Sequence, residues 1–168
     1  MKTLGVTTYT VTGSARIDAP PQRIFDIIRD YRVGHPGILP KQFSNMRVES
    51  GGIGAGTRIR FDITVMGRTD HFLAVVSEPE PGRVLVEKNL EPHDSVTTFV
   101  VAPEDGGRAA TVTIETVMPM RPGLAGKIER FLATRVMRSM YADELRRLAA
   151  RATASGASGD TTASARRR

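Results

Sequence analysis

Three histidines are the first candidates for chemistry in this 168-residue chain, because imidazole titrates near neutral pH and serves as acid, base or metal ligand. His35 lies in the loop "GHPGILP", where it could hold a hydrogen bond or move a proton. The alternative, which we favour, is that its ring bonds a backbone carbonyl of the loop. We interpret His71 and His93 as surface residues on a strand and in a turn. None of the three has a partner at the spacing of a metal motif, so we predict no metal site.

Polar side chains on otherwise apolar elements are the second group of candidates. A carboxyl group inside an apolar cavity would have a raised pKa and could serve as acid or base. Alternation along a strand sends about half of its residues to solvent, and we predict Glu87 and Glu115 on that face. Tyr141 could hold a ligand carbonyl, or be a core tyrosine with one satisfied hydroxyl. The catalytic residues therefore stay unknown, and the chain is not assigned as an enzyme.

Composition excludes several classes of function. The chain has no Cys, so disulfides, thiolate metal sites and cysteine nucleophiles are absent, and no G-x-S-x-G motif supports a serine nucleophile. We expect no cofactor. Neither a signal peptide nor an apolar run long enough to span a membrane is visible, which predicts a cytoplasmic location.

The net charge of +6 is unevenly distributed along the chain. Residues 1–121 hold 14 basic and 14 acidic side chains, whereas residues 122–152 hold 7 basic and 3 acidic ones. That basic segment contains only Phe131 and Tyr141 as aromatics, so we predict no nucleic-acid binding. Its cationic face is either the solvated side of a helix, which we favour, or a surface for weak contact with anionic membranes.

The hydrophobic periods change along the chain and predict an α+β fold. Residues 6–17 indicate a strand, and residues 18–31 indicate a helix that Gly34 and Pro36 break. Six further strands are predicted at 43–50, 57–65, 69–77, 83–90, 95–102 and 110–118. From Pro122 the period becomes helical for about 30 residues, and residues 153–168 have the composition of a disordered tail. We predict one domain, residues 1–152, in which a curved antiparallel sheet must be covered by the last helix.

Several segments, in order, resemble the SRPBCC superfamily, also called START-like or polyketide cyclase/dehydrase and lipid-transport proteins. They are "APPQRIFDIIRDYRVGHPGILP", "GIGAGTRIRF", "VSEPEPGRVLVE" and "MPMRPGLAGKIERFL", and the likeness covers about residues 6–150. The resemblance implies the helix-grip fold: seven antiparallel strands curved around a long C-terminal helix, with two short helices after the first strand. It also implies a hydrophobic tunnel for lipids, polyketides, hormones or quinones. Many relatives have a Trp in a Pro-x-Trp-x-Pro loop where this chain has Ile38.

We therefore predict that the chain binds a small hydrophobic molecule of the lipid, polyketide or quinone class. The alternative is a polyketide cyclase, aromatase or dehydratase, which requires polar groups to converge within one pocket. The sequence sets no oligomeric state. The predicted ligand-binding residues are His35, Ile38 and Leu39 at the cavity mouth, and Ile59, Phe61, Ile63, Phe72, Ala74, Val76, Val112, Ile114, Met137, Met140 and Tyr141 as lining.

Overall fold

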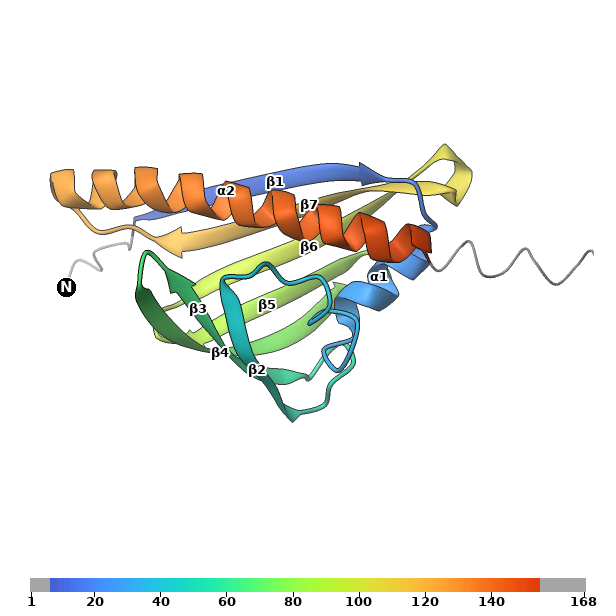
Figure 1. Cartoon of the computed structure of the whole chain (residues 1–168), viewed down its shortest axis with the longest axis horizontal. Coiled ribbons are helices and arrows are strands. Elements are labelled where there is room, and N and C mark those ends of the chain that lie inside the picture. Colours follow the sequence, from blue (N-terminus) through green and yellow to red (C-terminus); the bar gives the residue numbers. More distant parts are fainter. Residues whose placement is uncertain (1–6, 155–168) are drawn as a thin grey trace, which may run out of the picture.

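A computed structural model describes residues 7–154 and contains one antiparallel sheet and two α-helices (Figure 1). The elements are β1 (Thr8–Ile17), α1 (Pro21–Arg29), β2 (Phe43–Ser50), β3 (Arg58–Val65), β4 (Arg68–Glu80), β5 (Val84–Glu91), β6 (Ser95–Glu104), a 3₁₀ turn (Asp105–Gly107), β7 (Ala109–Pro119) and α2 (Gly123–Ala154). The helix-grip architecture is thus confirmed. One detail that the resemblance implied is wrong: α1 is the one helix between β1 and β2, and residues 31–38 form consecutive turns where Gly34 and Pro36 predict the break. The predicted tail from residue 155 onward lies outside the described residues.

The seven strands form a single sheet in the order β1-β7-β6-β5-β4-β3-β2, with every neighbouring pair antiparallel. Apart from β1, which pairs with β7, the strands follow each other as hairpins. Register shifts interrupt the pairing of β2 with β3 and of β4 with β5. Such irregularities bend a strand and increase its local twist, so the sheet curves and acquires a concave face.

The long helix α2 lies along the concave side of the sheet, next to β1 (Figure 1). A glycine on β1 permits this close approach, because a Cβ atom at Gly13 would lie 2.8 Å from the Cβ atom of Tyr141. The C-terminal half of α2 is anchored by buried side chains, among them Leu145 and Leu148. The N-terminal half buries only Gly126, so this part of the helix stands off the sheet and leaves space beneath it.

Helix α1 and the turns after it close one end of the curved sheet. Pro20 and Pro21 begin the helix, where a missing N–H group has no cost because first-turn N–H groups lack helical partners. At its end, the Asp30 carboxylate accepts hydrogen bonds from the backbone N–H groups of Arg32, Val33 and Gly34. These three bonds hold the turns of residues 31–38 in one conformation. The side chain at position 35 is thereby directed into the protein.

Candidate functional site

A cavity of about 760 Å³ lies between the concave face of the sheet and α2. It is a consequence of the fold, since one helix whose first half stands off the sheet cannot fill the concave side. The aromatic rings of Phe61 and Phe72 stack at 5.2 Å between centroids on neighbouring strands and form part of its wall. Phe43 of β2 packs against Phe61 at 5.5 Å and extends that apolar surface.

The structure brings most of the predicted site residues to this wall. Those on the wall are His35, Leu39, Ile59, Phe61, Ile63, Phe72, Ile114, Met137, Met140 and Tyr141. Four others, Ile38, Ala74, Val76 and Val112, belong to the packed core and do not line the cavity. Ala74 and Val76 follow Phe72 on the same strand, but they are buried in the core cluster to which Phe25 and Ile28 of α1 also belong. That the wall residues bind a ligand stays a prediction.

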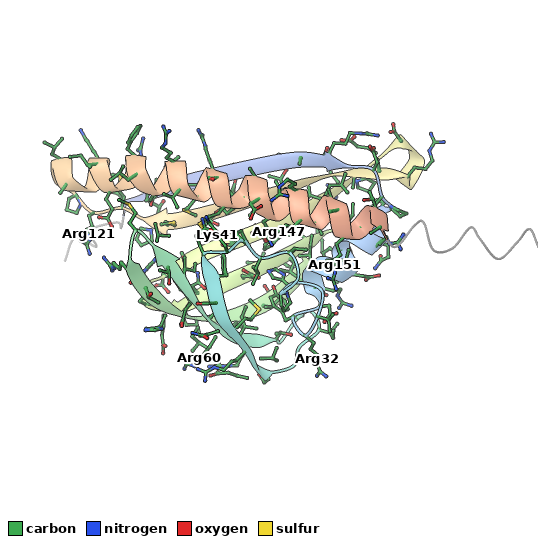
Figure 2. All side chains as sticks on the ribbon, viewed as in Figure 1. Arg32, Lys41, Arg60, Arg121, Arg147 and Arg151 are labelled. Atoms are coloured by element: carbon green, nitrogen blue, oxygen red, sulfur yellow. The ribbon has the colours of Figure 1, made fainter. Side chains whose placement is uncertain are left out.

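The cavity opens between the β3–β4 turn and the first half of α2. Met66 at the tip of that turn is 86% exposed, Leu132 of α2 is 45% exposed, and both line the cavity. Two arginines stand at the rim, Arg68 in an ion pair with Asp70 at 3.1 Å and Arg121 in one with Glu129 at 3.7 Å. Arg121 lies under the first turns of α2, at the opposite end from Arg151, which packs against the turns of residues 31–38 (Figure 2).

His35 lies buried at the inner end of the cavity, which corrects the expectation that it lies at the cavity mouth. It is buried because the turns fixed by Asp30 direct its ring between Tyr31, which stacks on it at 4.6 Å, and Phe99, which meets it edge-on. Its Nδ1 atom is 2.6 Å from the carbonyl oxygen of Ile28, near the end of α1. The interpretation favoured from the sequence, that the ring bonds a backbone carbonyl, is therefore correct for Nδ1.

The other side of the ring faces a carboxylate. His35 Nε2 lies 3.5 Å from Oε1 of Glu87, and the Tyr31 hydroxyl donates a 2.5 Å hydrogen bond to the same oxygen. Burial, and then the Glu87 charge, raise the pKa of Tyr31 well above its ordinary value, so the phenol remains a donor. Glu87 belongs to the cavity wall, which corrects the expectation that it lies on the solvent face.

The geometry around His35 assigns roles to its two ring nitrogens. A carbonyl oxygen only accepts, so Nδ1 must carry a proton for its bond to Ile28. Nε2 is the nitrogen that faces the Glu87 carboxylate, at 3.5 Å, at the inner end of the cavity.

Glu144 of α2 is a second carboxyl group on the wall, and it is only 4% exposed. Burial, reinforced by the negative charges of Glu87 and Asp143, raises its pKa to about 8. The group is therefore a neutral carboxylic acid at pH 7. An uncharged acid can donate a hydrogen bond, which a carboxylate cannot.

Hydroxyl and amide groups complete the polar part of the wall. The Tyr141 hydroxyl donates to Thr116 Oγ1 at 2.5 Å, and Thr116 shares a 2.8 Å hydrogen bond with Thr97. Burial raises the pKa of Tyr141 as well. On the next strand, Asn89 Nδ2 donates to Ser95 Oγ at 2.8 Å. Tyr141 is thus a core tyrosine with a satisfied hydroxyl that also faces the cavity.

The remaining candidates lie elsewhere. His71 is on the outer surface, 77% exposed, with Nδ1 2.6 Å from Oδ1 of Asp62. Glu115 is exposed beside Thr12 on β1. His93 is exposed at the edge of the cavity, with its ring 5.9 Å from that of Phe72. Within residues 7–154 no cluster of three metal-ligating side chains is found, and no helix in that range is long and apolar enough to span a membrane.

Sequence reasoning missed Tyr31, Thr97 and Glu144, although a signal for Glu144 exists. It lies four residues from both Met140 and Leu148, inside the buried stripe of α2. For Glu87 the signal is Leu85, two residues earlier and fully buried, because residues two apart share a face of a strand.

Comparison with known proteins agrees with the geometry. The family described as polyketide cyclase/dehydrase and lipid transport matches residues 8–153. Among solved structures, the Zhui aromatase/cyclase from Streptomyces sp. R1128 has 15% identity and a TM-score of 0.74, covering 91% of this chain and 99% of its own. A protein from Thermus thermophilus has 23% identity and a TM-score of 0.73, covering 88% and 99%. A START superfamily protein from Mycobacterium smegmatis has 15% identity and a TM-score of 0.66, covering 86% and 97%. A comparison with curated protein sequences gives no significant match.

Proposed function

The chain belongs to the polyketide cyclase/dehydrase and lipid-transport family, and on that premise we propose that it binds a small hydrophobic molecule of the lipid, polyketide or quinone class. The observation that carries the proposal is the cavity of about 760 Å³ in an otherwise packed domain. Ligand sites in proteins have volumes of about 300–1,000 Å³ and combine apolar walls with a few polar groups. Burial of apolar ligand surface, at about 25 cal/mol per Å², supplies the affinity.

Inside the ion pairs of the rim, the cavity combines polar groups with an apolar wall. His35, Glu87, Glu144 and Tyr141 contribute polar groups, whereas residues such as Phe61 and Met137 contribute apolar surface. A ligand that enters between Met66 and Leu132 therefore places its apolar body along the aromatic wall and its polar end inward. This division gives the bound molecule one orientation.

The proposal is tested by filling the cavity. Ala133 of α2 lines it, while Ala142 of the same helix is exposed and outside it. Ala133→Trp should abolish the fluorescence increase of Nile red, a neutral apolar dye, and Ala142→Trp should leave it unchanged. Native mass spectrometry on protein from its own host then gives the mass of any natural ligand. Equal dye binding by the two variants would contradict the proposal.

A second candidate is an enzyme of the cyclase type, and one observation favours it. His35 and Glu87 meet at 3.5 Å on the cavity wall, as the sequence hypothesis required of an acid/base pair. Glu87 would remove a proton from the carbon next to a ligand carbonyl, and the C–H electron pair would pass into the resulting enolate. Deuterium exchange into 2-tetralone, followed by NMR, tests this: Glu87→Gln should abolish any acceleration, whereas Glu115→Gln should retain it. If the wild type does not accelerate the exchange, the enzyme proposal is refuted and the binding function is not affected.

The exposed part of α2 supports a further proposal, weak contact with an anionic membrane surface from which a ligand is collected. Four large apolar side chains project from this half of the helix: Leu124, Ile128, Phe131 and Leu132. Four cations accompany them without any ion pair inside the described range: Lys127, Arg130, Arg135 and Arg138. Apolar side chains among cations are the pattern of a helix that lies on an anionic bilayer. The cavity opens beside this surface.

A further inference from the structure

Two buried side-chain oxygens lack a hydrogen-bond partner within residues 7–154, namely Oε1 of Glu144 and Oδ1 of Asn89. Native proteins satisfy nearly all buried polar atoms, because each one left alone costs free energy. Both of these residues are more than nine-tenths buried, and both belong to the wall of the same cavity. Asn89 Oδ1 only accepts, whereas a protonated Glu144 can donate, so we take Glu144 as the group that a bound molecule would pair with.

The surroundings of Glu144 determine what that partner is. No cation pairs with it in the described structure, and the charged groups that act on it are the acids Glu87 and Asp143. The hydroxyls of Tyr31 and Tyr141, which lie near enough to interact electrostatically with Glu144, are already bonded elsewhere, that of Tyr31 to Glu87 and that of Tyr141 to Thr116. A carboxyl group in this setting keeps its proton, and its free hydroxyl needs an acceptor.

We propose that Glu144 is the hydrogen-bond donor that recognises a carbonyl oxygen of the ligand, so that the cavity selects ketones or quinones over hydrocarbons of the same shape. The inference rests on the proposed binding function and adds the chemical class of ligand. A carbonyl oxygen accepts without donating, so it complements a neutral acid. A ligand carboxylate is excluded, because Glu87 already places a negative charge at this end of the cavity.

The two wall carboxyls thus have different tasks. Glu87 is occupied as the acceptor of the Tyr31 hydroxyl and faces His35, whereas Oε1 of Glu144 has no partner within residues 7–154 and remains available. Ionisation would convert Glu144 from a donor into an acceptor and repel the carbonyl oxygen. Recognition should therefore be complete at neutral pH and be lost as the pH rises past about 8.

The experiment uses two probes of nearly identical shape, fluorene and 9-fluorenone, which differ by one carbonyl. The ratio of their dissociation constants is measured by titration for the wild type, Glu144→Leu and Glu144→Gln, at pH 6 and pH 9.5. We expect Glu144→Leu to lower the preference for fluorenone about five-fold at pH 6, the usual effect of one hydrogen bond. The wild type should lose the same preference at pH 9.5. Glu144→Gln keeps an N–H donor that does not titrate, so it should retain the preference at both pH values.

The outcomes separate this inference from the binding function. If both probes bind the wild type but the ratio is the same in Glu144→Leu, the carbonyl assignment is overturned and the binding function stands. If neither probe binds the wild type, the binding function itself fails, and the inference fails with it. A loss of preference at pH 9.5 in Glu144→Gln as well would assign the pH effect to another group, such as the His35–Glu87 pair, and would also overturn the proposal.

Discussion

Glu144→Gln should make the protein more stable at alkaline pH and leave its stability at pH 5 nearly unchanged. The folded state holds the Glu144 proton up to about pH 8, whereas the unfolded chain releases it near pH 4.5. Between these values the folded state binds more protons, so the free energy of unfolding falls as the pH rises. At about 1.4 kcal/mol per pH unit, the interval corresponds to about 5 kcal/mol for this buried group.

Glutamine has the same shape as the protonated acid but does not titrate, so the variant escapes this loss. We expect its free energy of unfolding, relative to the wild type, to rise by about 3–5 kcal/mol between pH 5 and pH 9. Urea unfolding at several pH values measures the difference, and contributions from other titrating groups cancel between the two proteins. Glu115→Gln, at an exposed carboxylate, is the matched control and should show no such trend. A stability difference for Glu144→Gln that is the same at pH 5 and pH 9 would refute the reasoning, because it would mean that Glu144 is ionised normally in the folded state.

Three further predictions test the elements that form the site. Gly13→Ala adds a Cβ atom 2.8 Å from that of Tyr141, so it should lower the free energy of unfolding by about 1–3 kcal/mol. A chemical unfolding curve that overlays that of the wild type would contradict the tight packing of α2 on β1. Asp30→Ala removes the acceptor of three backbone hydrogen bonds, so it should lower the free energy of unfolding by about 1–2 kcal/mol and shift the imidazole NMR signals of His35. Unshifted signals would show that Asp30 does not position the ring. Phe131→Ser changes a side chain that is 67% exposed, so the free energy of unfolding should stay within about 0.5 kcal/mol of the wild type, whereas binding to anionic vesicles should weaken. Unchanged vesicle binding would contradict the proposal that this part of α2 contacts a membrane.

Much of the fold followed from local patterns. The alternation of Ile59, Phe61 and Ile63 predicted a strand with one apolar face, and the change of period after Pro122 predicted the long helix. Both signals are local, because the period of side chains along a strand or helix is set by its backbone geometry. The second short helix that the resemblance implied is absent between β1 and β2, where residues 31–38 form turns and Asp30 accepts from the N–H groups of Arg32, Val33 and Gly34.

The site depended on tertiary structure. Three ionisable residues that are far apart in the sequence line one cavity: His35 and Glu87 lie 3.5 Å apart, and Glu144 is near enough for the Glu87 charge to raise its pKa. The sequence predicts that the apolar face of α2 packs against the sheet. The first half of α2 instead stands off the sheet, so Ile128 and Phe131 on that face are exposed, and the order of elements could not show this. From its sequence alone, the chain specified the elements and the apolar surface they share. Only the tertiary structure decided which carboxyl groups would be enclosed with that surface. A carboxyl group keeps its proton at neutral pH only where packing of the elements excludes water.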